Sequence, residues 1–369
     1  MLRERINMQN SLLDRLIPDG DTLSCFTSCV AQFLFNLGLD YREHIGSQLA
    51  LFIRKDKYDL SNRLLFTHYH TALTVNADYH SIALRRCSTT DQEKLADRLA
   101  TQIIKNGSVI VCGDAYNIPW LVKYRKVHTP HWFVIAEKNT SSQYLVQDAF
   151  SYLDYQGEQN SYSSWVDFAA LVECLKEATN IDAEVHNREI YAFSTDASNE
   201  LNCHQGYQWY EFDSGNMAHE EAMSFSEKMH KNAGSMLGET SPPLEGDWQS
   251  GVFALDQLRG YVSENLSNRC LYDYVDDLWV IYRSRSLYLR YLISHKADLI
   301  TLGLETEIEL FESNVVASWA SLVKIMHYNK SCIESGVRVR QLPISLLENI
   351  RKYEMAHAMQ LVSKITLHP

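Results

Sequence analysis

The chain has 369 residues, 46% of them hydrophobic, and a formal net charge of −12 from 34 basic and 46 acidic side chains. Because this length exceeds what a single hydrophobic core usually supports, we expect two domains. The acidic balance and the lack of any basic tract argue against a nucleic-acid partner, which would need a local excess of Lys and Arg to contact phosphates.

The cysteines and the apolar segments bear on the cellular compartment. The eight cysteines are scattered, without the Cys-x-x-Cys spacing of a structural zinc site or a thioredoxin motif, so we expect reduced thiols. The first residues lack the continuous apolar segment of a signal peptide, and no stretch reaches the roughly 18 apolar residues of a membrane helix. We therefore expect a cytoplasmic protein without a membrane partner.

The first predicted element is a buried helix after a turn at residues 18–21. Small polar residues come first, an apolar run follows, and a glycine ends the run. This pattern places Ser24 near the N-cap and Gly38 at the C-cap. Cys25 is then expected in the first turn of the helix.

The following segments predict a mixture of helices and strands. Residues 91–106 carry apolar side chains at helical spacing, and residues 108–112 are typical of a short buried strand. Two more strands, 131–136 and 143–148, flank a polar turn and predict an antiparallel hairpin. Beyond the hairpin we expect an amphipathic stretch and one further strand, at residues 164–178 and 189–193.

The composition changes after about residue 195. Residues 194–213 are polar with few periodic apolar positions, and residues 238–251 form a loop rich in Pro, Gly and Ser. Elsewhere in this half helical periodicity dominates, over residues 218–237, 252–265, 271–295, 307–328 and 344–365. We therefore expect an α+β chain, with a domain over residues 1–195 that contains an antiparallel sheet and a mainly helical domain over residues 196–369.

The chemistry predicted from these elements centres on Cys25. A helix N-terminus stabilises a thiolate through its unpaired N–H groups and its positive dipole end, and the same donors suit an oxyanion. Such a nucleophile also needs an imidazole and a group that orients the imidazole. His131 opens one strand of the hairpin and Asp148 ends the other, so their side chains are expected to meet if the register is regular. A cysteine on a helix, followed by His and Asp on antiparallel strands, is the papain-like arrangement.

Several alternatives stay open for these residues. Cys25 is otherwise a buried small hydrophobe, Cys29 is the rival nucleophile one helical turn later, and His128 is the rival base. Asp148 is otherwise the cap of the turn that follows it. We favour the triad over these alternatives because Cys25, His131 and Asp148 follow one another in the order that a papain-like triad requires.

A second group of residues is a candidate for substrate binding. Asp114 ends the strand that begins near residue 108, and it is either a turn residue or part of an acceptor site. Tyr116 and Trp120 either line that site or pack in its wall. The histidines at positions 68, 70 and 80 are not accompanied by a carboxylate or cysteine cluster, so we expect no metal site. The sequence gives no reason to expect a cofactor.

Four short motifs in residues 20–175 resemble the N-terminal family of butirosin-biosynthesis protein H. The motifs are Leu23-Ser-Cys-x-x-x-Cys29, Val109-Ile-Val-Cys-Gly-Asp-Ala-Tyr116, Tyr124-x-x-x-His-x-x-His-Trp-Phe-Val-Ile135 and Tyr144-Leu-Val-Gln-Asp148. More distantly, the Cys and His-Asp segments are similar to bacteriocin-processing cysteine peptidases. Ser24 stands where the family usually has His, and Ala149 stands where it usually has Pro.

The resemblance implies a papain-like acyltransferase of specialised metabolite biosynthesis. Its donor would be an acyl or peptidyl carrier protein, and its acceptor a small-molecule amine. Cys25 would attack the carrier thioester, and His131 would act first as base and then as acid. The alternatives are a cysteine peptidase or amidase that passes the acyl group to water, and an inert binding scaffold.

Overall fold

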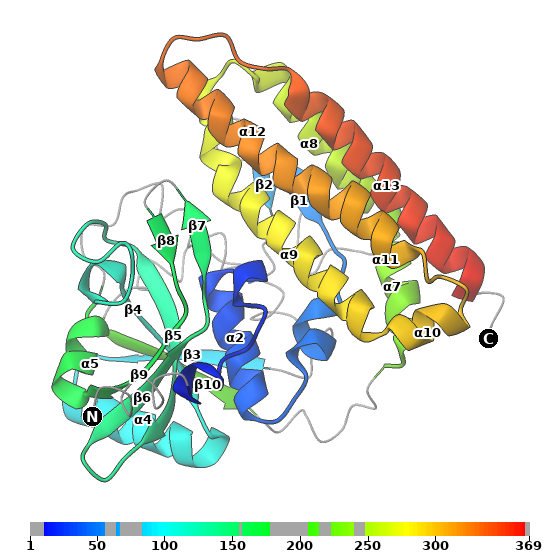
Figure 1. Cartoon of the computed structure of the whole chain (residues 1–369). Coiled ribbons are helices and arrows are strands. Elements are labelled where there is room, and N and C mark those ends of the chain that lie inside the picture. Colours follow the sequence, from blue (N-terminus) through cyan, green and yellow to red (C-terminus); the bar gives the residue numbers. More distant parts are fainter. Residues whose placement is uncertain are drawn as a thin grey trace. The chain divides into compact units, whose positions relative to one another are not determined.

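The computed structural model describes residues 11–55, 64–66, 83–154, 157–177, 206–213, 223–239 and 248–365. The chain forms two compact units (Figure 1). The first unit combines Met1–His44 with Asn76–His219, and the second combines Ile45–Val75 with Glu220–Pro369. This division differs from the expected domains 1–195 and 196–369, because an early segment belongs with the C-terminal helices and a strand after residue 195 belongs to the first unit.

The first unit is built on a six-stranded sheet with the strand order β3-β10-β4-β5-β6-β9. All neighbouring strands in it are antiparallel. The strands span Ala83–Thr89 (β3), Tyr207–Asp213 (β10), Val109–Asp114 (β4), Pro130–Lys138 (β5), Gln143–Asp148 (β6) and Tyr162–Asp167 (β9). A separate hairpin joins β7 (Tyr152–Asp154) to β8 (Gly157–Gln159). The antiparallel sheet expected in the N-terminal half is thus present.

Strand β10 was not expected, because the sequence of its stretch is polar with few periodic apolar positions. Trp209, Tyr210 and Phe212 are buried, and they point alternately to the two faces of the sheet. A strand that lies between two others and is covered on both faces shows no clean polar alternation. Its pattern therefore does not reveal which side chains face the core.

Helices cover both faces of the sheet (Figure 1). On one face lies α2 (Cys25–Asn36), whose Phe26 ring contacts the rings of Trp132 and Tyr210. On the other face α4 (Gln92–Asn106) and α5 (Phe168–Cys174) pack on a cluster that includes Val111 and Phe133. The sequence-predicted amphipathic stretch 164–178 is thus the end of β9 followed by α5, and residues 189–193 lie outside the described residues.

The N-cap of α2 is Ser24, as predicted, whereas its C-cap is Leu37, one residue before the predicted Gly38. The Ser24 hydroxyl accepts the Thr27 N–H, and the Thr27 hydroxyl accepts the Ser24 N–H, which together form a capping box. At the other end Gly38 adopts a positive φ of 76°, which favours glycine, and its N–H donates to the Phe35 carbonyl. Cys25 is therefore fixed as the first helical residue.

The hairpin of β5 and β6 contains a β-bulge that no local feature of the sequence predicts. Near the turn Lys138 pairs with Tyr144, but farther along Ile135 pairs with Val146, so that Ala136 is an extra residue in β5. A bulge shifts the register by one residue, and such a shift exchanges the faces to which side chains point. The regular register assumed from the sequence is therefore wrong.

The second unit is mainly helical, as expected. Its helices are α7 (Phe225–Leu237), α8 (Gly251–Asn265), α9 (Val275–Ser294), α10 (Lys296–Thr301), α11 (Glu307–Leu310), α12 (Ala317–Glu334) and α13 (Leu342–Ile365). A small sheet with the order β11-β1-β2 joins them, from Gln249–Ser250, Phe52–Lys55 and Leu64–Phe66.

The two units also contain short turns. Short 3-10 turns span Gly20–Thr22, Ala115–Asn117 and Arg269–Tyr274, and π-helical turns span Arg42–Gly46 and Phe311–Val316.

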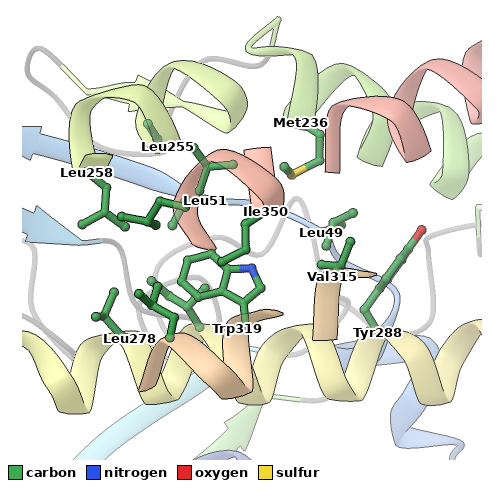
Figure 2. Close-up of a cluster of buried hydrophobic side chains, with 14 of the residues drawn as sticks. Leu49, Leu51, Met236, Leu255, Leu258, Leu278, Tyr288, Val315, Trp319 and Ile350 are labelled. Carbon is green, nitrogen blue, oxygen red and sulfur yellow. The ribbon is translucent and has the colours of Figure 1, made fainter. Parts of the chain in front are cut away.

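The core of the second unit surrounds the buried indole of Trp319 (Figure 2). Its N–H donates to Glu354, whose carboxylate forms a buried ion pair with Arg285 at 3.0 Å. Leu49 and Leu51 belong to the same cluster, which explains why their segment groups with the helices. None of the described helices is both long and apolar enough to cross a bilayer.

Candidate active site

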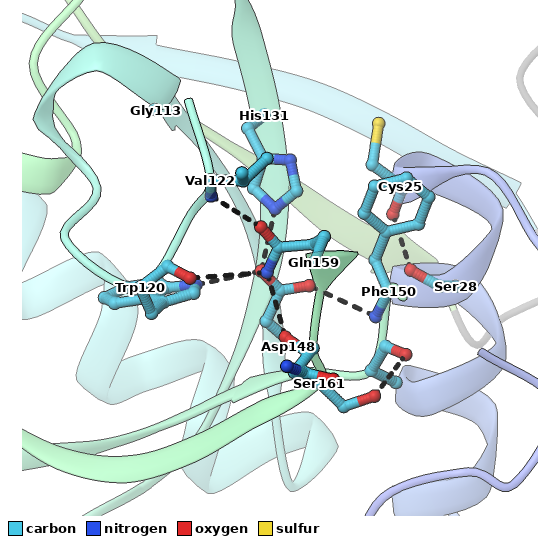
Figure 3. Close-up of polar contacts among 12 residues, drawn as sticks. Cys25, Ser28, Gly113, Trp120, Val122, His131, Asp148, Phe150, Gln159 and Ser161 are labelled. Carbon is cyan, nitrogen blue, oxygen red and sulfur yellow. Dashed lines mark hydrogen bonds and ion pairs between the residues drawn. The ribbon is translucent and has the colours of Figure 1, made fainter. Parts of the chain in front are cut away.

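Cys25 is the first residue of α2 and is partly exposed. The first N–H groups of a helix have no acceptor in a preceding turn, and they give this end a partial positive charge. Cys25 therefore lies where a thiolate and an oxyanion are both stabilised. Figure 3 shows its side chain at the first turn of α2, with His131 on the neighbouring strand.

His131 and Asp148 form a buried hydrogen bond, as expected (Figure 3). The Nε2 atom of His131 lies 2.8 Å from Oδ2 of Asp148, and the two side chains are 7% and 0% exposed. Because Asp148 accepts from Nε2, the neutral imidazole keeps its proton there. The Nδ1 atom then carries the lone pair that a general base needs.

The bulge at Ala136 is what places these two side chains on one face of the sheet. Beyond the bulge Val134 pairs with Gln147, so residue 133 opposes Asp148 and His131 is its diagonal neighbour on the same face. If the pairing of Lys138 with Tyr144 continued without the bulge, Asp148 would oppose Val134. It would then point to the face opposite His131.

The carboxylate of Asp148 is held by further donors. Trp120 donates its indole N–H to Oδ2 at 2.9 Å, and the backbone N–H of Phe150 donates to Oδ1 at 3.3 Å. Trp120 is itself fixed by parallel stacking on Tyr162, with ring centroids 4.5 Å apart. Trp120, expected from the sequence to be a substrate-binding residue, therefore positions Asp148.

The electrostatics of the site favour a protonated His131. Burial lowers the pKa of His131, but the charge of Asp148, its hydrogen bond and a hydrogen bond with the Cys25 side chain together raise that pKa to about 9. At neutral pH the imidazolium therefore lies beside the sulfur of Cys25.

Cys29 has the opposite environment. It is buried, and burial, followed by the charges of Asp148 and Cys25, raises the pKa of its thiol well above the usual value. A thiol held in its neutral form is a poor nucleophile. The environment of Cys29 suits packing against the sheet.

Asp114 and Tyr116 lie around His128 rather than around His131. The buried Asp114 carboxylate bonds to Nδ1 of His128 at 2.6 Å and accepts the backbone N–H groups of Tyr116 and Thr129. The Tyr116 ring stacks on the His128 ring, with centroids 4.2 Å apart. Asp114 is thus a turn residue that also orients a second imidazole.

A cavity of about 430 Å³ borders Trp120. Its walls include the aromatic side chains of Trp120, Tyr124, Tyr162 and Trp165, and the charged side chains of Arg125 and Asp167. Asp114 and Tyr116 do not line it, although the sequence groups them with Trp120. A ligand in this cavity would contact the residue that holds Asp148.

Two glycines allow close packing around the site. A Cβ at Gly113, which pairs with His131, would lie 2.0 Å from the Cys174 carbonyl oxygen. A Cβ at Gly20 would lie 1.8 Å from the carbonyl oxygen of Ala149, the residue after Asp148. From the sequence Gly20 is predicted only to be a turn residue. Its close contact with Ala149 could not be predicted from the local sequence pattern.

The described residues contain no group of three or more His, Cys, Asp or Glu side chains arranged to hold a metal ion. The histidines at positions 68, 70 and 80 lie outside the described residues. No protein-family model matches the sequence, and no curated protein matches it closely enough to be counted as a relative.

Proposed function

We propose that this chain is a papain-like cysteine acyltransferase. It takes an acyl or aminoacyl group from a carrier-protein thioester onto Cys25 and passes it to an amine. The observation that carries the proposal is the His131–Asp148 hydrogen bond next to a cysteine at a helix N-terminus. An α-helix that begins at the nucleophile and packs on an antiparallel sheet carrying His and Asp supports the papain-like assignment.

The first half-reaction transfers the acyl group to the enzyme. The Cys25 thiolate attacks the thioester carbonyl, and the oxyanion that forms faces the N–H groups at the start of α2. The bond between the carbonyl carbon and the carrier sulfur then breaks. His131 donates its Nδ1 proton to the departing thiolate, which leaves a neutral imidazole beside the acylated Cys25.

The second half-reaction forms the amide. An amine attacks the acylated Cys25, His131 takes a proton from the new C–N centre, and Cys25 leaves as a thiolate paired with the imidazolium. Transfer to an amine rather than to water requires a site that limits access of solvent. The low exposure of His131 and Asp148 favours this outcome over hydrolysis.

An acyl N-acetylcysteamine thioester, which imitates the end of a carrier arm, tests the proposal. We expect an amide product when a primary amine is present, and none with Cys25→Ala or His131→Ala. Cys29→Ala is the matched control and should keep the activity, because Cys29 packs in the interior. Release of free acid without any amide would instead indicate an amidase or peptidase. No turnover and no acylation of Cys25 would indicate a binding scaffold.

A further inference from the structure

We infer that His128, held by Asp114, is a second general base that deprotonates the cationic amine acceptor. This inference rests on the proposed acyl transfer and adds to it a residue for the second half-reaction. It follows from three observations: the orientation of the His128 ring, its position just before the start of β5 and beside the end of β4, and the proton count of the reaction.

The His128 ring is oriented as a general base needs. Its Nδ1 bonds to the Asp114 carboxylate at 2.6 Å, so the neutral ring keeps its proton on Nδ1 and carries its lone pair on Nε2. Stacking on Tyr116 fixes the plane of the ring, and the guanidinium of Arg125 lies over Tyr116, 5.2 Å from its centroid. The His128 side chain is 30% exposed, so water can carry away a proton that it accepts.

His128 and its partner Asp114 lie at the same end of the sheet as Cys25. Phe26 near the start of α2 contacts Tyr210, whereas Phe33 two turns later contacts Phe212. Tyr210 pairs with Ile110, so α2 runs toward the beginning of β4 and its first turn lies toward the end of β4. That end is Asp114.

Asp114 also points to the face of the sheet that α2 covers. Side chains alternate along a strand, so Asp114 shares a face with Cys112. Cys112 is close enough to Cys29 for its charge to raise the Cys29 pKa. In the ladder Asp114 pairs with Pro130, one step from the pair of Gly113 with His131. Asp114 and His131 therefore occupy neighbouring steps of the ladder, on alternating faces, at the end of the sheet where α2 begins.

The proton count explains why a second base is useful. An alkylamine resembles the lysine side chain, whose pKa is about 10.4, and is an ammonium ion at neutral pH. It must lose one proton to become a nucleophile and a second when the amide forms. His131 has one free lone pair, on Nδ1, and accepts one of these protons. His128 accepts the other and returns it to water, while the C–N bond forms and the C–S bond to Cys25 breaks.

The test compares two acceptors on the same acylated enzyme at neutral pH. Ethylamine is charged and must lose two protons, whereas hydroxylamine is uncharged and must lose only one. We expect His128→Gln to lower the ratio of ethylamide to hydroxamate by about 100-fold, the lower range for a general base. Asp114→Asn should lower the same ratio, because it replaces one carboxylate oxygen by an NH2 group and removes the charge that holds the Nδ1 proton of His128. The exposed His230 provides the control, and His230→Gln should keep the wild-type ratio.

Because the readout is a ratio of products from one acyl-enzyme, partial misfolding of a variant does not affect it. An unchanged ratio in both His128→Gln and Asp114→Asn would overturn the inference. Loss of Cys25 acylation itself in both variants would also overturn it, because the inference assigns His128 to the second half-reaction. If the wild type forms hydroxamate but no ethylamide, this inference fails and acyl transfer stands. If the wild type is never acylated at Cys25, the proposed function fails.

Discussion

His131 and Asp148 point to the same face of the sheet because β5 has one residue more than β6 between the turn and the site. The extra residue is Ala136, and the diagonal placement that it produces leaves Nε2 of His131 2.8 Å from the Asp148 carboxylate. A single backbone irregularity thus determines whether a base and its orienting group can meet.

Deleting Ala136 should therefore separate the two side chains. We expect the pairing of Lys138 with Tyr144 to extend along the hairpin, which would turn Asp148 to the other face and abolish most of the activity. Loss of the slowly exchanging His131 Nε2–H signal in NMR spectra would report the change. Inserting a glycine between Thr140 and Ser141 is the control, because it lengthens the turn without changing the strands. Full activity of the Ala136 deletion would contradict this explanation of the register.

Asp148→Asn should preserve the shape of the site but remove the charge that favours the imidazolium. We expect the His131 pKa to fall from about 9, and turnover to fall by about 10²- to 10⁴-fold. Titration of the His131 ring by NMR measures the first effect, and steady-state turnover measures the second. A His131 pKa that stays near 9 in the variant would show that Asp148 does not set it.

The raised His131 pKa also predicts how stability depends on pH. Because the folded pKa of about 9 lies above the unfolded value of 6.5, the ion pair with Asp148 stabilises the fold fully below pH 6.5. That contribution is lost as the pH rises through 9. Urea unfolding of the wild type and Asp148→Asn across this range should show a stability difference that shrinks with rising pH. A stability difference between the two proteins that grows with rising pH would contradict this prediction.

Trp120→Phe should keep the ring stacked on Tyr162 but remove the hydrogen bond to Asp148. A hydrogen bond to a charged group is worth about 1.5–3 kcal/mol, so we expect a loss of stability of that order and a smaller loss of turnover than in Asp148→Asn. Trp165→Phe changes another wall of the same cavity and serves as the control. Equal effects of the two substitutions would point to the cavity rather than to Asp148.

In the helical unit, Glu354→Gln should destabilise the fold. It removes the charge that pairs with the buried Arg285 and leaves that guanidinium without compensation. Breaking a buried ion pair from one side costs about 3–5 kcal/mol. Chemical denaturation followed by tryptophan fluorescence measures the loss, because Trp319 contacts Glu354. Glu348→Gln, at an exposed ion pair with Arg259, should change stability little.

The sequence was most informative where the signals are local. The caps at Ser24 and Gly38 and the helical periodicity of residues 91–106 predicted α2 and α4 almost to the residue. The apolar runs on either side of residues 139–142 likewise predicted β5 and β6. The presence of His131 and Asp148 at one end of the hairpin followed from these elements.

Features that depend on distant parts of the chain were not predictable. Ala136 carries no local signal of a bulge, and β10 pairs with strands more than 90 residues earlier. The bond from Trp120 to Asp148 links residues 28 apart, and no periodicity indicates which carboxylate an indole will reach. The partner of His128 was likewise unforeseen, because Asp114 and His128 meet only after β4 and β5 have paired.

The most direct test of the central claim is the mass of the acylated enzyme after a short reaction with an acyl N-acetylcysteamine thioester. Trypsin leaves Cys25 and Cys29 on one peptide, because no Lys or Arg lies between Arg15 and Arg42, so the experiment uses Cys29→Ala beside the wild type. We expect one acyl group per chain, on Cys25, in both proteins, and far slower acylation in His131→Ala. An unmodified Cys25, or an acyl group found on Cys29 instead, would contradict the account.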